Sequence, residues 1–241
     1  MMNNKNIVLA LSFILASCAA PTSSLENNQT NKSGYIFYID ENTYLHQSEI
    51  DNKIILPTEE YGVPNYTNLL PNAPREYRNG FHEGIDFSSP LNYPIKAVYD
   101  GIVIRSNNMH EDVDIDTYNE ILMTTEKLKK TPEDIYNFIL LGKSVVIDHG
   151  YSITKKFRSI TVYAHLSSIP EDVKPGKKVK MGDIIGFSGN TGTSSGALRN
   201  EKGAHLHWEI HFDDSKGRYF LGQNIPKEKL YNNIIQLFDL Q

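Results

Sequence analysis

The sequence predicts a mainly β protein, because its folded part consists largely of short apolar stretches separated by turn residues. Five such stretches are rich in β-branched and aromatic residues and are bounded by Gly, Pro, Asn or Asp: residues 94–106, 143–150, 159–166, 183–189 and 205–212. The last stretch alternates strictly between two kinds of side chain. Its His and Glu residues share one face, and we expect the other face to meet the core: Leu206, Trp208, Ile210 and Phe212.

One segment departs from the β pattern. Residues 116–130 have the composition of a helix, and the Thr-Pro-Glu sequence at 131–133 then supplies an N-cap, a proline at the first helical position and an acidic first turn. The second helix should end at Gly142, since glycine favours the left-handed conformation that follows a helix. We therefore predict a helical insertion over about residues 107–143. Its apolar side chains should pack back onto the β domain: Ile135, Phe138, Ile139 and Leu141.

The residues before the main domain predict a small N-terminal β segment. Two β-prone pieces, YIFYI and KIILP, flank a polar turn within residues 35–57, and residues 58–80 carry the Pro, Asn and Gly content of a loop. We assign residues 35–74 to this β segment and its loop. The main domain then covers residues 75–225, and residues 226–241 form a C-terminal segment.

The N-terminus has the pattern of an export signal. Lys5 precedes an apolar run at residues 7–15, which is too short to span a bilayer because roughly 20 residues are needed. The run ends at Leu-Ala-Ser-Cys, whose Cys18 is the only cysteine and so forms no internal disulfide. These four residues resemble the lipobox of bacterial lipoproteins; an ordinary secretory signal with a chance cysteine is the alternative.

The lipobox resemblance implies cleavage before Cys18 and attachment of lipid to it. Residues 1–17 are then the signal peptide, and the Ser-, Thr- and Asn-rich residues 18–34 form a flexible tether. The expected location is the bacterial cell envelope, periplasmic or on the outer face, with the membrane as a partner through Cys18. No nucleic-acid partner is expected, because the formal net charge is −5 and nucleic-acid binding needs a basic face.

A first candidate metal motif lies at residues 81–87. His82 and Asp86 are four residues apart, which places them on the same side of either a helix or a strand. An imidazole nitrogen and a carboxylate oxygen make a plausible pair of zinc ligands. The HExxH zinc motif does not apply, because Asp86 stands at its second histidine position and Gly84 and Ile85 disfavour a helix. Two solvated polar residues at a strand start are the alternative.

Further candidates lie on two predicted strands. His205 and His207 occupy alternate positions, so both can reach one site, and His165 ends the strand at 159–166. The chain has eight histidines, and four of them stand at mutually compatible positions. Of the other four, we assign His46 and His110 to the surface and His149 to a structural role. His211 shares the strand face of His207, but it lies two positions further along and is not expected to be a ligand.

Residues 75–212 resemble the LytM/lysostaphin-type (M23) zinc metalloendopeptidases. The resemblance runs through HEGIDF, PIKAVYDGIV, IDHG, YAHLSSI, VKPGKKVKMGDIIGFSGNTG and HLHWEI. It implies an antiparallel β-sheet groove with one zinc ion at its floor. It also implies that His82, Asp86 and His207 bind the metal and that His165 and His205 form a catalytic pair. Three segments depart from the family pattern and should reshape the groove walls: residues 92–94, 107–143 and 197–204.

The expected chemistry is zinc-dependent hydrolysis of a peptide bond. Three protein ligands leave a fourth zinc position open for water. His165 or His205 would take the proton of that water while the other stabilises the oxyanion, with the assignment open. Glu209 is either a partner that orients an imidazole or a solvated cross-strand residue.

The resemblance and the export signal together predict peptidoglycan as substrate, cut at its peptide cross-links or bridges. Two alternatives remain at this point: a non-catalytic wall-binding module that activates another hydrolase, and a zinc lipoprotein that hydrolyses a different peptide or protein. The insertion at 107–143 is a lid, a docking site for a protein regulator, or additional packing.

Overall fold

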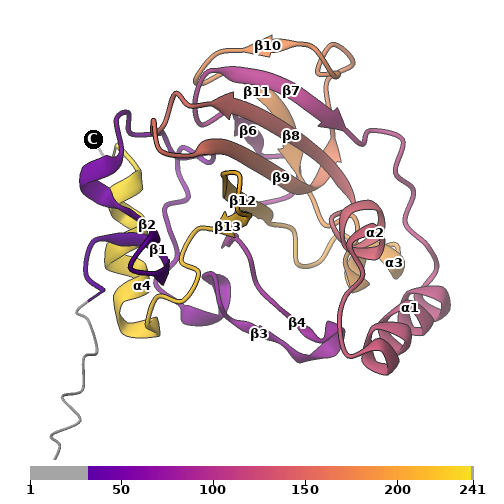
Figure 1. The fold of residues 1–241 in the computed structure, drawn as a ribbon. Coiled ribbons are helices and arrows are strands. Elements are labelled where there is room, and N and C mark those ends of the chain that lie inside the picture. Colours follow the sequence, from indigo (N-terminus) through magenta and orange to yellow (C-terminus); the bar gives the residue numbers. More distant parts are fainter. Residues whose placement is uncertain (1–31, 240–241) are drawn as a thin grey trace, which may run out of the picture. The chain divides into compact units, whose positions relative to one another are not determined.

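The computed structural model describes residues 32–239 (Figure 1). The expected signal peptide (1–17), the lipidation site Cys18 and most of the expected tether (18–34) lie outside the described residues. Among residues 32–239, no helix combines the length and the apolar character that crossing a membrane requires.

A nine-stranded antiparallel sheet forms the centre of the fold, which confirms the predicted mainly β class. The hydrogen-bonded order is β10-β7-β8-β9-β11-β6, and β12 joins it by pairing with β9, β5 and β13. The strands are β5 (Ile85–Phe87), β6 (Pro94–Lys96), β7 (Gly101–Ser106), β8 (Lys143–Gly150), β9 (Arg158–Ser168), β10 (Lys178–Val179), β11 (Ile184–Ser188), β12 (Leu206–Asp213) and β13 (Arg218–Phe220).

The stretch predicted as one strand at 94–106 is two strands. Residues 98–100 bend the chain, so that β6 pairs with β11 while β7 pairs with β8 and β10. The prediction of a continuous strand was wrong because the Asp100-Gly101 pair, a turn signal, lies inside the apolar stretch.

Strand β12 separates the core from the functional face. Its predicted core residues Leu206, Trp208, Ile210 and Phe212 are each 0% exposed and belong to the main hydrophobic cluster. The opposite face carries His207, Glu209 and His211, which are also buried because the insertion covers them. The alternation in the sequence therefore identified the two faces correctly.

The N-terminal hairpin consists of β1 (Tyr35–Asp40) and β2 (Thr43–His46). The piece KIILP at 53–57, which we expected to flank the turn as a strand, does not pair with β1; its Ile54 forms one isolated bridge to Phe238 instead. Short elements follow before the main sheet: η1 (Gln47–Glu49), η2 (Thr67–Leu69), β3 (Pro74–Arg75), η3 (Glu76–Arg78) and β4 (Gly80–Phe81). The chain ends in α4 (Lys227–Ile234) and η5 (Ile235–Leu237), whose buried residues share the main core.

The predicted helical insertion is present between β7 and β8. It contains α1 (Ile115–Leu128), α2 (Glu133–Ile135) and a π-helical turn, η4 (Tyr136–Leu140). Figure 1 shows α1 and α2 on the same side of the sheet as the short helix α3 (Ser194–Ala197). Helix α1 contacts both η3 and α3.

Two details of the insertion differ from the prediction. Thr131 does not cap the second helix, because Pro132 takes the cap position and the Thr131 hydroxyl donates to the Arg78 carbonyl. Phe138 does not pack on the body but is 59% exposed, while Leu141 is buried as expected. Gly142 ends the segment with φ +62°, as predicted for a residue after a helix.

Candidate metal centre and active site

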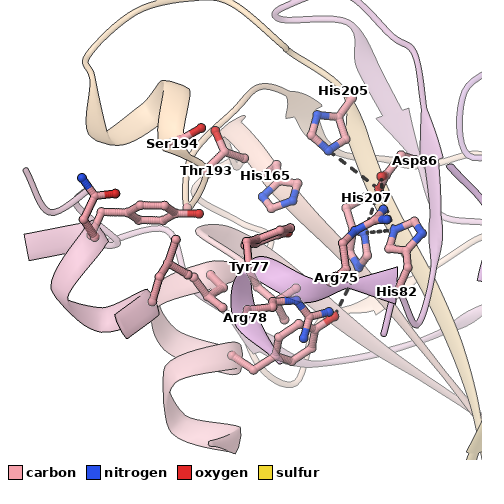
Figure 2. A pocket seen from close by; sticks show the side chains of 17 residues that line it. Arg75, Tyr77, Arg78, His82, Asp86, His165, Thr193, Ser194, His205 and His207 are labelled. Carbon is pink, nitrogen blue, oxygen red and sulfur yellow. Dashed lines mark hydrogen bonds and ion pairs between the residues drawn. The ribbon is translucent and has the colours of Figure 1, made fainter. Parts of the chain in front are cut away.

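Strand pairing brings the three predicted metal ligands together. Asp86 on β5 stands directly opposite His207 on β12, so both side chains leave the sheet on the same face. His82 precedes β5, and its backbone N–H donates to the Ala73 carbonyl at 2.9 Å. The His82 Nε2, Asp86 Oδ1 and His207 Nδ1 atoms lie 2.9–3.0 Å from one another (Figure 2).

Each ligand side chain has its second polar atom engaged elsewhere. His82 Nδ1 lies 2.9 Å from the Leu70 carbonyl oxygen, and because that oxygen only accepts, Nδ1 carries the hydrogen. His207 Nε2 lies 2.7 Å from the carboxylate of Glu209. Arg75 donates to Asp86 Oδ2 at 3.1 Å. Such outer partners fix the orientation of metal ligands in other proteins.

The three remaining atoms, His82 Nε2, Asp86 Oδ1 and His207 Nδ1, converge on one point, where a metal cation can bind. Two imidazole nitrogens and one carboxylate oxygen are ligands that zinc takes, with bonds of about 2.0–2.2 Å. Ligand atoms at the corners of such a tetrahedron are about 3.3 Å apart, close to the 2.9–3.0 Å spacing of the triad. The residues therefore fit a zinc ion.

Protons compete with a metal ion for the side-chain atoms of the triad. Burial disfavours the charged form of Asp86, but the two neighbouring histidines and their hydrogen bonds outweigh burial and hold the pKa of Asp86 well below its usual range. Burial also disfavours the charged form of His207, but its hydrogen bonds to Asp86 and Glu209 outweigh burial and raise the pKa of His207 to about 9. A metal ion entering the triad must displace the proton on His207.

His165 reaches the triad through an irregularity in β9. Val145 and Lys143 on β8 pair with Tyr163 and Leu166 on β9, so β9 has one extra residue between the two pairs, a β-bulge. His165 lies in this bulge with φ +59°, a left-handed conformation that is rare outside glycine. The bulge directs His165 to the side of His207, with ring centroids 5.5 Å apart, while both flanking core side chains stay buried.

His165 and His205 face each other beside the triad. Their ring centroids are 4.8 Å apart, and His205 Nε2 lies 3.8 Å from Asp86 Oδ1. Each Nδ1 donates to a backbone carbonyl at 2.8 Å, His165 to Thr191 and His205 to Gly203. In the neutral form of each ring, Nε2 is therefore the nitrogen that can accept. Burial and the neighbouring histidines hold the pKa of His165 well below its ordinary value, so this ring is neutral at neutral pH.

Comparison with known proteins decides the family. The sequence pattern of Peptidase family M23 matches residues 80–219, more than half of the chain. The chain belongs to peptidase family M23. This confirms the resemblance that HEGIDF, YAHLSSI and HLHWEI indicated.

Relatives of this M23 peptidase include bacterial proteins with longer chains. An uncharacterized metalloprotease of Buchnera aphidicola is 30% identical over 152 residues, which cover 63% of this chain and 29% of the relative. The peptidoglycan DD-endopeptidase ShyA of Vibrio cholerae is 29% identical over 154 residues, which cover 62% of this chain and 26% of ShyA. The alignments thus span less than a third of either relative.

Solved structures similar to this M23 peptidase include two peptidases. A zinc-containing peptidase from Vibrio cholerae matches 70% of this chain and 39% of its own, with 22% identity and a TM-score of 0.44. The catalytic domain of lysostaphin from Staphylococcus simulans matches 67% of this chain and 95% of its own, with 20% identity and a TM-score of 0.39.

Glu209 contacts His207, one of the three predicted metal ligands. It is 2% exposed, accepts from His207 at 2.7 Å and from His211 at 2.7 Å, and also accepts from the Tyr136 hydroxyl. Burial alone would raise the pKa of Glu209, but the bonds to the two histidines outweigh burial and hold this pKa well below its usual range. Glu209 is therefore not a solvated residue, and its role as a partner that orients the His207 imidazole stays a prediction.

Three partners of the triad were missed from the sequence. Tyr136, Arg75 and the Leu70 carbonyl lie in segments without a recognisable motif, and they contact Glu209, Asp86 and His82 respectively. Burial and Glu209 raise the pKa of Tyr136 well above its usual range, so its phenol remains a hydrogen donor. No sequence signal predicts these contacts, because they depend on how the insertion and the 68–78 segment pack.

The histidines outside the site divide as follows. His149 is buried and bonded on both nitrogens, to the Asp100 carbonyl and the Thr161 hydroxyl, each at 2.8 Å, as expected of a structural residue. His46 is half-buried and caps η1. The side chain of His110 is only 6% exposed and contacts Asp112, so its assignment to the surface was wrong. His211 bonds Glu209 and does not join the triad.

A cavity of about 460 Å³ opens over the triad and extends away from it. Besides the five site residues, its lining comes from Arg75, from η3 (Tyr77 and Arg78), from residues 192–194 and from the insertion. Figure 2 shows the triad at one end of this cavity, with Thr193 and Ser194 along one side of it and His165 between them and the triad. Its volume is within the usual range of substrate pockets.

Proposed function

We propose that this M23 peptidase is a zinc-dependent endopeptidase that hydrolyses peptide cross-links or bridges of bacterial peptidoglycan. The observation that carries the proposal is the convergence of two imidazole nitrogens and one carboxylate oxygen beside two further imidazoles whose Nδ1 atoms donate to backbone carbonyls. The first group fits zinc, and the second provides proton acceptors for the attack of water on a peptide bond.

His82, Asp86 and His207 would hold the metal. Bound zinc would supply Lewis acidity toward the scissile carbonyl and lower the pKa of a coordinated water toward about 7. Arg75, Glu209 and the Leu70 carbonyl keep the three ligands in register, so little reorganisation is needed when the metal binds.

His165 and His205 would move the proton. Because both Nδ1–H groups donate to backbone carbonyls, Nε2 is the accepting nitrogen of each ring in its neutral form, and both rings line the cavity. The ring that takes a proton from the attacking water passes that proton to the leaving amine. The other ring, after taking a proton from solvent, would donate a hydrogen bond to the oxyanion. Placing both rings within 4.8 Å of each other lets one water-sized group contact both.

Two considerations support peptidoglycan as the substrate. The relative ShyA is named a peptidoglycan DD-endopeptidase, and the N-terminal lipobox pattern implies export and anchoring through Cys18, which would place the enzyme at the cell wall. A purely wall-binding module would need neither the ligand triad nor the paired histidines, and this chain has both. Retention of the protein in the membrane fraction, and its loss on Cys18→Ser substitution, would support the anchoring.

The proposal is tested with His165→Gln and His205→Gln. Each variant should bind zinc like the wild type and release muropeptides from purified sacculi on the order of 10²–10³ times more slowly. His149→Gln, a change at a buried histidine outside the site, is the control. Undiminished release by both variants would contradict the catalytic assignment, and loss of zinc from either would make that histidine a ligand instead.

A further inference from the structure

The insertion forms the far end of the active-site cavity. Two walls flank the cavity as it leaves the triad, one from η3 and one from the 192–194 loop. Three side chains of α1 line the same cavity: Tyr118, Asn119 and Leu122. In the fold, α1 contacts both η3 and α3, so the helix reaches from one wall to the other.

Apolar packing joins the insertion to the wall that carries α3. Tyr118 of α1, Leu140 of η4 and Ala197 of α3 form a separate buried cluster, each with 5–6% exposure. Partly buried apolar residues of the insertion, among them Leu122, surround this cluster. The helix is therefore held by a small core of its own rather than resting on the surface.

Hydrogen bonds tie the insertion to both walls. On one side, the Asp112 carboxylate accepts from the Gly192 backbone N–H at 2.6 Å, and the Asp112 carbonyl accepts from the Arg199 guanidinium at 2.8 Å. On the other side, the Thr131 hydroxyl donates to the Arg78 carbonyl, and the Arg78 guanidinium stacks on the Tyr136 ring at 4.8 Å. Ties at both ends make the insertion a fixed wall and not a lid that swings open.

We propose that the insertion closes one end of the substrate groove, so that this peptidase cuts peptides whose chain on one side of the scissile bond is short. This inference rests on the proposed endopeptidase function. A peptide entering from the open side can lie across the triad, but its continuation meets α1. The part of the peptide on that side of the scissile bond must then end within the cavity. A cross-link next to a chain end has such a short part.

The three α1 side chains at the closed end are uncharged. Burial raises the pKa of Tyr118 to about 12, so its phenol stays neutral, and Asn119 and Leu122 carry no charge. The nearby Arg78 is 6% exposed, and its guanidinium already donates to the Phe81 carbonyl at 2.5 Å. The pocket therefore favours a short peptide segment with small or apolar side chains.

Two series of synthetic peptides with one common scissile bond test the closure. One series is lengthened only on the amino side of that bond, and the other only on the carboxyl side, from one residue to several. For the zinc-loaded wild type, lengthening in one series should lower kcat/KM about tenfold or more, because the added residues clash with the pocket end. Lengthening in the other series should leave kcat/KM within a factor of about two.

Variants of α1 connect the length preference to the insertion. Leu122→Ala, and separately replacement of residues 115–128 by a Gly-Ser linker that keeps Asp112 and Thr131, should reduce the penalty for the longer peptides. Leu128→Ala is the matched control, since Leu128 is on the same helix, is 50% exposed and does not line the cavity. It should keep the wild-type preference.

The outcomes separate this inference from the proposed function. Cleavage of long and short peptides at equal rates in both series would overturn the closure and leave the endopeptidase function standing. A length penalty that both α1 variants retain in full would likewise overturn it. Failure of the zinc-loaded wild type to cut any peptide would overturn the proposed function, and the closure as a substrate restriction with it.

Discussion

Each predicted ligand of the triad has a hydrogen-bond partner outside the triad. Asp86 is held by Arg75, His82 by the Leu70 carbonyl and His207 by Glu209. Glu209 has the most connections, since it accepts hydrogen bonds from two histidines and from Tyr136 on the insertion. Metal binding should therefore respond to residues that never touch the metal.

Replacing Glu209 by glutamine should weaken zinc binding by about 10–100-fold, because the ring of His207 loses a charged partner that orients it and raises its basicity. Competition with a chromophoric chelator measures the change. Glu201→Gln, at an exposed position, is the control. A Glu209→Gln protein with unchanged zinc affinity and wild-type stability would show that the contact has no role in the metal site.

The buried His149 makes folding stability depend on pH. Burial lowers the pKa of His149 below its unfolded value of 6.5, so the unfolded chain binds a proton more readily than the folded one. As pH falls below 6.5, the free energy of unfolding should decrease by up to about 1.4 kcal/mol per pH unit from this residue alone. The loss ends when pH falls below the folded pKa.

Denaturant unfolding of the zinc-loaded wild type and of His149→Gln, measured from about pH 7.5 to about pH 5, isolates this contribution. The variant should be less stable at the upper pH, where it lacks the two hydrogen bonds of His149, and should lose stability less steeply toward the lower pH. Parallel curves for the two proteins would contradict the assignment.

At the scale of elements, Gly142 is the junction between the insertion and β8. It adopts φ +62°, and a Cβ on it would overlap the backbone of Thr191, whose carbonyl accepts from His165. Gly142→Ala should therefore combine left-handed strain with overpacking and destabilise the protein by about 2–5 kcal/mol. Thermal or denaturant unfolding measures this change.

Gly150 provides the matched control for that substitution. It has a similar φ of +57°, but within residues 32–239 nothing beyond its chain neighbours lies within 4 Å of the position that an added methyl group would take. Gly150→Ala should therefore cost only about 1–2 kcal/mol. Equal losses for the two alanine variants would mean that the close approach to Thr191 has no energetic effect.

The sequence predicted those elements that are determined by residues close together in the chain. The alternation of β12, the insertion and its glycine end were all visible in the sequence, and so was the ligand triad once the family resemblance was included. The direction of His165 was not, because it depends on a β-bulge that strand pairing with β8 creates. Tyr136 and Arg75 were missed for a related reason: no spacing rule connects a residue of an insertion to a strand far along the chain, as Tyr136 is connected to Glu209.

For the molecule as a whole, the core extends beyond the residues that match the family. Phe37 of the N-terminal hairpin is 0% exposed and packs against Phe157, Phe212 and Tyr219, with ring centroids 5.0–5.6 Å apart. Phe238 near the C-terminus packs against Trp208 at 5.6 Å. The segments outside residues 80–219 therefore stabilise the sheet that carries the metal site.

Phe37→Ala should destabilise the protein by about 3–5 kcal/mol, since it removes a fully buried ring and leaves a cavity. The measurement is the denaturant midpoint of the zinc-loaded protein. Phe138→Ala, which removes a ring that is 59% exposed, should cost less than about 1 kcal/mol. If the two variants were equally stable, the N-terminal hairpin would contribute little to the core.

The most direct test of the proposed function measures zinc content and peptidoglycan cleavage on the same preparation. The protein lacking residues 1–18 is compared with its His207→Ala variant for bound zinc and for release of cross-linked muropeptides from purified sacculi. We predict about one zinc per wild-type chain together with cleavage, and neither for the variant. A wild-type protein that binds no zinc, or that binds zinc and leaves sacculi intact, would contradict the proposal of a zinc-dependent cell-wall endopeptidase.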